Sequence, residues 1–257
     1  MYARLRRNMV DWIREIAAIA GARGLVVGMS GGIDSSLTAV LAHEAFPNSS
    51  LGLVIPCHSA EEDRRLALQV AEQFGIPTRV VEIDGIFDRL LEAVKLPADE
   101  TGPARMAEAN LKPRLRMAVF YYHANSLNYL VCGTSNKSEM MLGYFTKNGD
   151  NAVDLMPLGG LLKGEIRKLA AEVGLPREVI DRPPTAGLWE GQTDERELGV
   201  TYEMIDEYLR GMIHGRKREI SRQEADRILG YITGSSHKRE RPPVFVPGGH
   251  ILLEGKG

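Results

Sequence analysis

Short apolar runs alternate with segments of helical periodicity through the first third of the chain. The apolar runs and the helical segments that follow them lie at 25–29 and 33–46, 51–56 and 60–74, and 78–83 and 86–94. Strands separated by helices of about 10–15 residues form parallel sheets, because the chain must cross back over the sheet between strands. The sequence therefore predicts an α/β fold: a doubly wound, mostly parallel sheet with helices on both faces.

The rest of the sequence extends this pattern, and we expect residues 1–257 to form a single domain with a polar tail from about 234. Further helices are expected at 5–20, 105–125, 163–173, 199–210 and 221–232, and a strand at 128–132. The Pro-, Asp- and Gly-rich residues 95–104 predict a mobile connection. Residues 143–162 hold many Gly, Asn and Asp with little periodicity, and so long an irregular stretch usually carries function.

Charge and cysteine usage exclude several classes of partner. With 32 basic and 34 acidic residues and a net charge of −2, the chain has no general attraction for nucleic acid or an anionic membrane. No apolar stretch reaches the roughly 18 residues that a membrane span needs. Cys57 and Cys132 do not form a CxxC pair, which suits a reducing cytoplasm. We therefore expect a cytoplasmic protein with neither a nucleic-acid nor a membrane partner.

The most specific local signal lies between the first predicted strand and helix. Residues 28–36 read Gly-Met-Ser-Gly-Gly-Ile-Asp-Ser-Ser. Glycines let the backbone approach an anion closely, and the N–H groups at a helix start point at phosphate oxygens. Asp34 would repel phosphate unless a cation such as Mg²⁺ lies between them. The segment fits neither the Walker A pattern nor GxGxxG, and the alternative is a Gly-rich turn with an Asp helix cap.

The string Ser-Gly-Gly-Ile-Asp-Ser resembles the pyrophosphate-binding loop of the N-type ATP pyrophosphatases, which cleave ATP between the α- and β-phosphates. Further segments resemble motifs of one branch, the NAD synthetases, in the same order over roughly residues 5–245. They are Asn110–Met117, Gly133–Glu139, Gly143–Asp150, Pro183–Ala186, Gln192–Glu195 and His237–Arg239. The resemblance implies a ligase that amidates deamido-NAD to NAD with ATP and ammonia, through an acyl-adenylate, releasing AMP and pyrophosphate.

The resemblance also assigns roles to individual residues. ATP contacts are implied for Gly28, Met29, Ser30, Gly31, Gly32, Ile33, Asp34, Ser35, Thr134, Lys163 and Thr185. Glu139 is implied to join Asp34 on Mg²⁺. Deamido-NAD contacts are implied for Arg114, Lys147, Asp154, His237 and Lys238. Asp150, in the Gly-rich segment, is our choice for the residue that holds ammonium before it loses a proton.

The nitrogen donor and the assembly follow from the same resemblance. Glutamine-dependent members carry a long N-terminal amidase domain, whereas the first motif here begins at residue 28, so free ammonia is expected. Residues 133–136 read Gly-Thr-Ser-Asn, a form shared with the glutamine-dependent enzymes, so a separate glutaminase partner stays open. The family implies a homodimer. The competing readings are another ATP-pyrophosphatase amide ligase, a tRNA thiolase, and a nucleotide sensor without activity.

Overall fold

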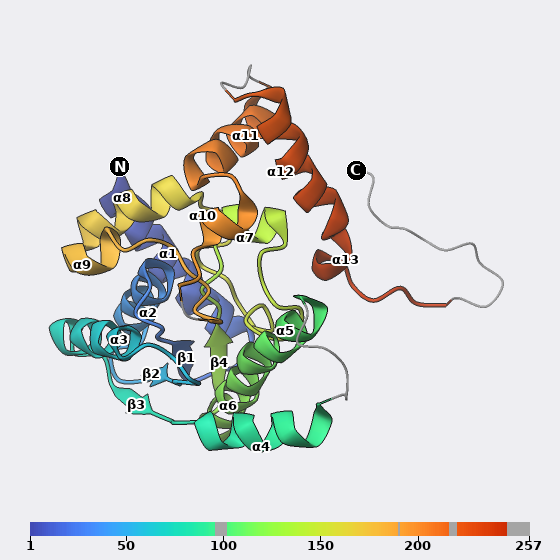
Figure 1. The fold of residues 1–257 in the computed structure, drawn as a ribbon. Coiled ribbons are helices and arrows are strands. Elements are labelled where there is room, and N and C mark those ends of the chain that lie inside the picture. Colours follow the sequence, from blue (N-terminus) through green and yellow to red (C-terminus); the bar gives the residue numbers. More distant parts are fainter. Residues whose placement is uncertain (96–101, 190, 216–219, 246–257) are drawn as a thin grey trace.

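A parallel sheet organises the part of the chain that the computed structural model describes, which is residues 1–95, 102–189, 191–215 and 220–245. Its strands are β1 (Gly24–Gly28), β2 (Ser50–Val54), β3 (Thr78–Val80) and β4 (Tyr129–Cys132). Within the described residues the strand order is β3-β2-β1-β4, and every pairing is parallel (Figure 1). The parallel sheet that the alternating pattern predicted is confirmed.

Alternate side chains of β1 face two different cores. Leu25 and Val27 pack into the larger core, whereas Val26 belongs to a second core on the opposite face of the sheet. The larger core takes side chains from α1 (Tyr2–Ile19), α2 (Ile33–Ala45), α3 (Glu61–Phe74) and α8 (Lys163–Val173), and the second from α4 (Asp84–Val94) and α6 (Leu111–Leu127). Helices therefore cover both faces, as predicted, and strands buried on both sides need the continuous apolar runs that the sequence has.

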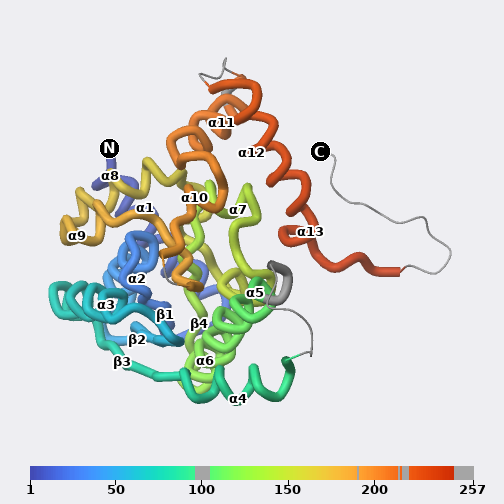
Figure 2. Tube along the Cα trace, viewed as in Figure 1, coloured from blue at the N-terminus to red at the C-terminus, as the bar shows by residue number. Residues whose placement is uncertain are grey.

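A third apolar cluster belongs to helices that lie beyond the carboxyl ends of the strands. It includes side chains from α7 (Lys137–Leu142), α10 (Asp194–Leu198), α11 (Tyr202–His214) and α12 (Arg222–Gly234). The tube in Figure 2 shows α12 leading into the short α13 (Ser236–Arg239), from which residues 240–245 extend away from the body. The short α9 (Arg177–Ile180) follows α8 beside α2. This third cluster packs near the carboxyl ends of the strands.

Several predicted element bounds were wrong. The helix predicted at 105–125 is two helices, α5 (Gly102–Ala109) and α6, which are separated at Asn110. Pro113 explains the break, because its ring would clash with the carbonyl group four residues earlier and it has no N–H to donate. The strand predicted at 78–83 ends at Val80. Residues 96–101 of the connection predicted to be mobile lie outside the described residues.

The strand order places a crevice between β1 and β4. The chain moves outward from β1 to β2 and β3, then returns to pair β4 on the other side of β1. The loops that follow β1 and β4 consequently lead in opposite directions, and ligands of open α/β sheets bind in such a crevice. No helix within the described ranges has the length and apolarity needed to cross a bilayer.

Candidate active site

The loop after β1 turns sharply at Gly31. This residue has a φ of +77°, and a Cβ added to it would lie 2.4 Å from the carbonyl oxygen of Asp63. Both the backbone conformation and the contact with α3 therefore require glycine. Gly32 is then the N-cap residue of α2, with extended backbone angles. The loop delivers the chain into the first turn of a helix whose free N–H groups favour an anion.

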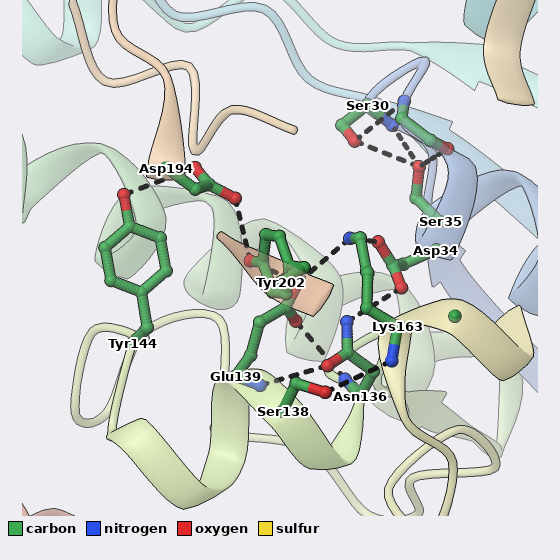
Figure 3. A network of polar contacts seen from close by, with 12 residues as sticks. Ser30, Asp34, Ser35, Asn136, Ser138, Glu139, Tyr144, Lys163, Asp194 and Tyr202 are labelled. Carbon is green, nitrogen blue, oxygen red and sulfur yellow. Dashed lines mark hydrogen bonds and ion pairs between the residues drawn. The ribbon is translucent and has the colours of Figure 1, made fainter. Parts of the chain in front are cut away.

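The serines of this loop bond to one another. Ser35 Oγ accepts a hydrogen bond from Ser30 N at 3.2 Å and donates one to the carbonyl oxygen of Gly32 at 3.0 Å. The hydroxyl groups of Ser30 and Ser35 lie 2.9 Å apart, and Figure 3 shows them turned toward each other. These contacts hold the loop in shape and keep two hydroxyl groups at the crevice.

A buried ammonium group joins two acidic side chains at the base of the crevice. Lys163, whose side chain is 3% exposed, donates hydrogen bonds from Nζ to Asp34 Oδ2 and, at 3.2 Å, to Glu139 Oε1 (Figure 3). Asp34 follows β1, Glu139 lies in α7 just after β4, and Lys163 opens α8. The fold therefore brings together three residues that are implied to handle ATP and its metal.

Tyrosine hydroxyl groups extend this cluster toward the C-terminal helices. The Tyr202 hydroxyl group donates to Asp194 Oδ2 at 3.0 Å and lies 3.5 Å from Glu139 Oε1. Tyr144 donates to Asp194 Oδ1 at 3.2 Å and to Glu197 Oε2 at 2.8 Å. The acids of the site are thus linked to α10 through a continuous set of hydrogen bonds (Figure 3).

Burial and neighbouring charge shift the acid–base behaviour of this cluster. Burial raises the pKa of Glu139 to about 7; the Lys163 ammonium opposes the shift and the Asp34 carboxylate adds to it. Burial alone would lower the pKa of Lys163, but the Asp34 and Glu139 carboxylates outweigh it and raise that pKa. Burial also raises the pKa of Asp194, although Lys163 and Tyr202 work against it. Lys163 therefore stays protonated, while Glu139 titrates near neutral pH.

A cavity of about 770 Å³ opens above these residues, and we call it the central cavity. Its size is typical of a site for a small-molecule ligand. The residues implied to contact ATP that line it are Gly28, Met29, Ser30, Gly32, Ile33, Asp34, Ser35, Thr134, Lys163 and Thr185. Gly31 lies at the turn of the same loop. Glu139 lines the cavity as well, so the structure brings the implied ATP and metal residues together.

The residues implied to bind deamido-NAD are placed differently. Of the five, Lys238 lines the central cavity, and its Nζ donates to the carbonyl oxygens of Gly143 and Phe145. Arg114 and Lys147 lie together through a 3.3 Å hydrogen bond from Arg114 Nη2 to the Lys147 carbonyl oxygen. Lys147 Nζ in turn donates to the carbonyl oxygen of His237 at 2.6 Å. We call Arg114, Lys147, His237 and Lys238 the basic cluster, which meets the central cavity at Lys238.

Asp154 has local partners instead. Its carboxylate accepts hydrogen bonds from the backbone N–H of Val131 at 2.7 Å and from the Tyr121 hydroxyl group at 3.1 Å. These bonds fix the segment after the 143–150 loop to β4. Among the described residues Asp154 makes no hydrogen bond or ion pair to the basic cluster, and its role toward the substrate stays a prediction.

Asp150 lines the central cavity, and its role toward ammonium stays a prediction. Its side chain is exposed to solvent. Oδ1 accepts a 2.7 Å hydrogen bond from the Thr146 N–H. Burial raises the pKa of Asp150, and this backbone bond works against the shift.

Sequence reasoning missed several residues of the site. Arg116 lines the cavity and donates from Nε to the Ile55 carbonyl oxygen at 2.9 Å. Asn136, Asp194 and Tyr202 bond to the acids or to one another. Arg116 and Asn136 lie inside motifs that the sequence does display. Asp194 likewise lies inside the Gln192–Glu195 motif, whereas the role of Tyr202 depends on its contact with Glu139, 63 residues away, for which the sequence offers no local signal.

The donor set fits a magnesium ion. The oxygens of Asp34 and Glu139 that meet Lys163 point at a common cation, and carboxylate oxygens are the ligands that Mg²⁺ prefers. Among the described residues no three His, Cys, Asp or Glu side chains gather as a complete metal site. Mg²⁺ usually binds through one or two carboxylates together with substrate phosphates and water, so two carboxylates beside a phosphate loop suffice.

Comparison with known proteins agrees with this geometry. A family model described as NAD synthase matches residues 5–242. The chain is 45% identical to the NH(3)-dependent NAD(+) synthetase of Carboxydothermus hydrogenoformans, over 92% of this chain and 95% of that protein. Its structure resembles an NMN synthetase from Francisella tularensis, with a TM-score of 0.88 and 32% identity over 97% of this chain and 99% of that one. It also resembles an NH3-dependent NAD synthetase from Campylobacter jejuni, with a TM-score of 0.81 and 26% identity over 96% and 99% of the two chains. The chain therefore belongs to the NAD synthase family.

Proposed function

We propose that this chain converts deamido-NAD to NAD by ATP-dependent amidation with ammonia. The observation that carries the proposal is the meeting of the Ser30–Asp34 loop, Glu139 and Lys163 at one end of the central cavity. This meeting of residues suits a nucleoside triphosphate, and the rest of the cavity is large enough for a second substrate. The relatives named as NH(3)-dependent NAD(+) synthetases supply the identity of that substrate.

ATP enters with its phosphates against the start of α2. The N–H groups of the loop and the hydroxyl groups of Ser30 and Ser35 neutralise the departing pyrophosphate. Asp34 and Glu139 would hold a Mg²⁺ ion, which would supply positive charge to offset the negative charge of the phosphates. Lys163 then moves from the acids to a phosphate oxygen, since its flexible chain can follow the larger negative charge.

The nicotinate carboxylate attacks the α-phosphorus and forms an acyl-adenylate, whose AMP leaving group makes the carbonyl carbon electrophilic. Ammonia attacks this carbon, AMP departs, and the nitrogen releases a proton to give the neutral amide. Asp150 lies on the cavity wall, where it holds ammonium and takes its proton. Because no protein nucleophile takes part, the rate depends on positioning the substrates, which contributes on the order of 7 kcal/mol by effective-molarity arguments.

Arg114, Lys147, Asp154, His237 and Lys238 bind deamido-NAD in this proposal. Arg114 and His237 are exposed, so a dinucleotide lying across them would face solvent in a single chain. A second copy covering this cluster would exclude that solvent, and we infer that the active form is a homodimer. Cys57 and Cys132 are both free thiols, which supports action in the reducing cytoplasm.

A second candidate substrate is the corresponding mononucleotide, nicotinate mononucleotide. The NMN synthetase from Francisella tularensis matches this structure with a TM-score of 0.88 over nearly the whole chain. Both substrates present the same carboxylate to the adenylation site, so the central cavity accepts either chemistry. They differ in the adenylate half, which reaches the basic cluster only in deamido-NAD.

An assay with ATP, Mg²⁺ and ammonium decides between the substrates. We expect NAD and AMP to form in equal amounts from deamido-NAD, with a higher kcat/KM than for nicotinate mononucleotide. A preference for the mononucleotide would replace deamido-NAD by the second candidate. Formation of ADP in place of AMP would contradict both, because it means attack at the γ-phosphorus. Replacing ammonium by glutamine should abolish turnover of the isolated chain.

A further inference from the structure

Asn136 is completely buried between the two acids of the site. It is the N-cap residue of α7 and 0% exposed, and the roles implied for ATP, substrate and metal do not include it. Its Oδ1 accepts a hydrogen bond from the Glu139 N–H at 3.0 Å. Its Nδ2 donates to Asp34 Oδ1 at 3.0 Å, and its backbone N–H donates to Glu139 Oε2 at 3.2 Å. One residue thus contacts both acidic side chains (Figure 3).

These bonds divide the oxygens of each carboxylate between two partners. Asp34 Oδ1 accepts a hydrogen bond from Asn136, and Asp34 Oδ2 accepts one from Lys163. Glu139 Oε2 accepts a hydrogen bond from the Asn136 backbone N–H, and Glu139 Oε1 accepts one from Lys163. In both acids, therefore, Asn136 holds one oxygen and leaves the other directed at the shared cation. A capping role alone would account for the bonds with Glu139 but not for the bond to Asp34.

Electrostatic repulsion between the two carboxylates explains why a restraint from Asn136 is useful. Two carboxylates that aim oxygens at one point repel each other, and without a restraint they rotate apart when the cation leaves. The neutral amide group of Asn136 restrains Asp34 by donating a hydrogen bond and adds no charge. Partners of this kind fix the orientation of metal ligands, and their loss typically costs about 10- to 100-fold in metal affinity.

We propose that Asn136 is a positioning residue, which orients Asp34 and Glu139 so that the two oxygens now in contact with Lys163 converge on the cation bound with the ATP phosphates. The inference rests on the proposed function, since that function puts Mg²⁺ between the two acids. It concerns metal-dependent binding of ATP and not the choice of the acid that is amidated.

The test separates orientation of the acids from capping of the helix. Asn136→Ser keeps a good N-cap side chain for α7 but cannot donate to Asp34 across the same distance. Asn136→Ala loses both functions. Ser221→Ala is a matched control: Ser221 caps α12 in a complete capping box, away from the central cavity. Circular dichroism and Tm establish that each variant is folded.

ATP binding is then titrated with Mg²⁺ by calorimetry, without deamido-NAD or ammonium. We expect both Asn136 variants to need about 10- to 100-fold more Mg²⁺ for half-maximal ATP binding. Binding of ATP in excess EDTA should match the wild type, and Ser221→Ala should lower Tm without changing the Mg²⁺ requirement. A wild-type Mg²⁺ requirement in Asn136→Ser would overturn the proposal and leave Asn136 as a cap alone. Failure of the wild-type chain to bind ATP would instead defeat the proposed function.

Discussion

The carbonyl oxygen of Leu188 accepts a 2.9 Å hydrogen bond from the buried ammonium group of Lys112. This bond ties the segment 183–189, which carries Thr185, to the first turn of α6. Arg105 lies 4.7 Å from the ring centroid of Trp189 and holds the same segment from α5. Pro184 accepts a further bond from the Asp194 N–H at 3.0 Å. One wall of the central cavity is therefore held in place by side chains that do not line it.

Replacing this ammonium group should loosen that wall. In Lys112→Met the Leu188 carbonyl group loses its charged donor, which costs about 1–3 kcal/mol. We expect a higher KM for ATP, a smaller change in kcat, and faster amide hydrogen exchange within 183–189. Lys95→Met is the control, because Lys95 is exposed and pairs with Glu108 at 3.8 Å. Unchanged exchange and an unchanged KM in Lys112→Met would show that the segment is held by its other contacts.

Gly31→Ala should abolish ATP binding. The φ of +77° strains any other residue, and the new Cβ meets the Asp63 carbonyl oxygen at 2.4 Å, so either the loop or α3 must shift. Gly21→Ala isolates the strain, since Gly21 has a φ of +65° with no atom within 4 Å of an added Cβ. We expect roughly 1 kcal/mol of destabilisation at Gly21 and more at Gly31, from denaturant titration. Equal losses in both variants would mean that the contact with α3 is harmless.

The free energy of unfolding should vary with pH because Glu139 titrates at a higher pH in the folded protein than in the unfolded chain. Its pKa rises from an ordinary 4.5 to about 7 in the folded protein, mainly through burial. Between pH 4.5 and 7 the folded state holds a proton on Glu139 that the unfolded chain has released. The stabilising contribution of Glu139 to the free energy of unfolding is therefore complete below pH 4.5 and is lost as the pH rises through 7. Asp150 and Asp194 shift in the same direction. The unliganded protein should therefore lose stability between pH 5 and 7.

Tm measured across this range in EDTA tests the assignment. Glu139→Gln removes the titrating group and keeps the shape, so its Tm should vary less with pH than that of the wild type. Added Mg²⁺ should stabilise the wild type more at pH 8 than at pH 5, because the ion favours the ionised carboxylate. Parallel profiles for wild type and variant would assign the pH dependence to other acids.

Asp150→Asn tests the group that we place on ammonium. The amide group keeps an acceptor for the Thr146 N–H but loses the negative charge and the basic site. Positioned acid–base groups contribute about 10²- to 10⁴-fold, so we expect ammonia-dependent turnover to fall by at least 10²-fold. ATP binding, measured separately, should stay within about twofold. Normal turnover with normal binding would remove Asp150 from the mechanism.

Local patterns allowed the sheet and the phosphate loop to be predicted. Leu25–Met29 is apolar because β1 is covered on both faces, and the glycines after it serve a turn that the sequence displays directly. The break at Asn110 was missed because helical periodicity continues across it, although Pro113 marks it. The short helices α7, α9, α10 and α13 contain too few turns to show a periodic pattern.

Contacts across the chain could not be predicted in the same way. Asn136 and Asp34 are 102 residues apart, and Lys163 and Asp34 are 129 apart. Nothing in the sequence around Tyr202 indicates that its hydroxyl group lies beside Glu139 and Asp194. Their proximity depends on the strand order, which decides which loops become neighbours. The resemblance to a family supplied Lys163 and Glu139, but not the partners that orient them.

The pairing of β4 with β1 also has a consequence for the order in which the protein acquires its site during synthesis. The phosphate loop and three strands leave the ribosome before the residues of β4, and Lys163 follows later still. Until then Asp34 lacks both its amide partner and its ammonium partner. A chain that ends before residue 136 lacks Asn136 and Lys163, the two residues that bond to the Asp34 carboxylate in the folded protein. The two halves of the crevice that meet at Asp34 are therefore both present only after residue 163 has been translated.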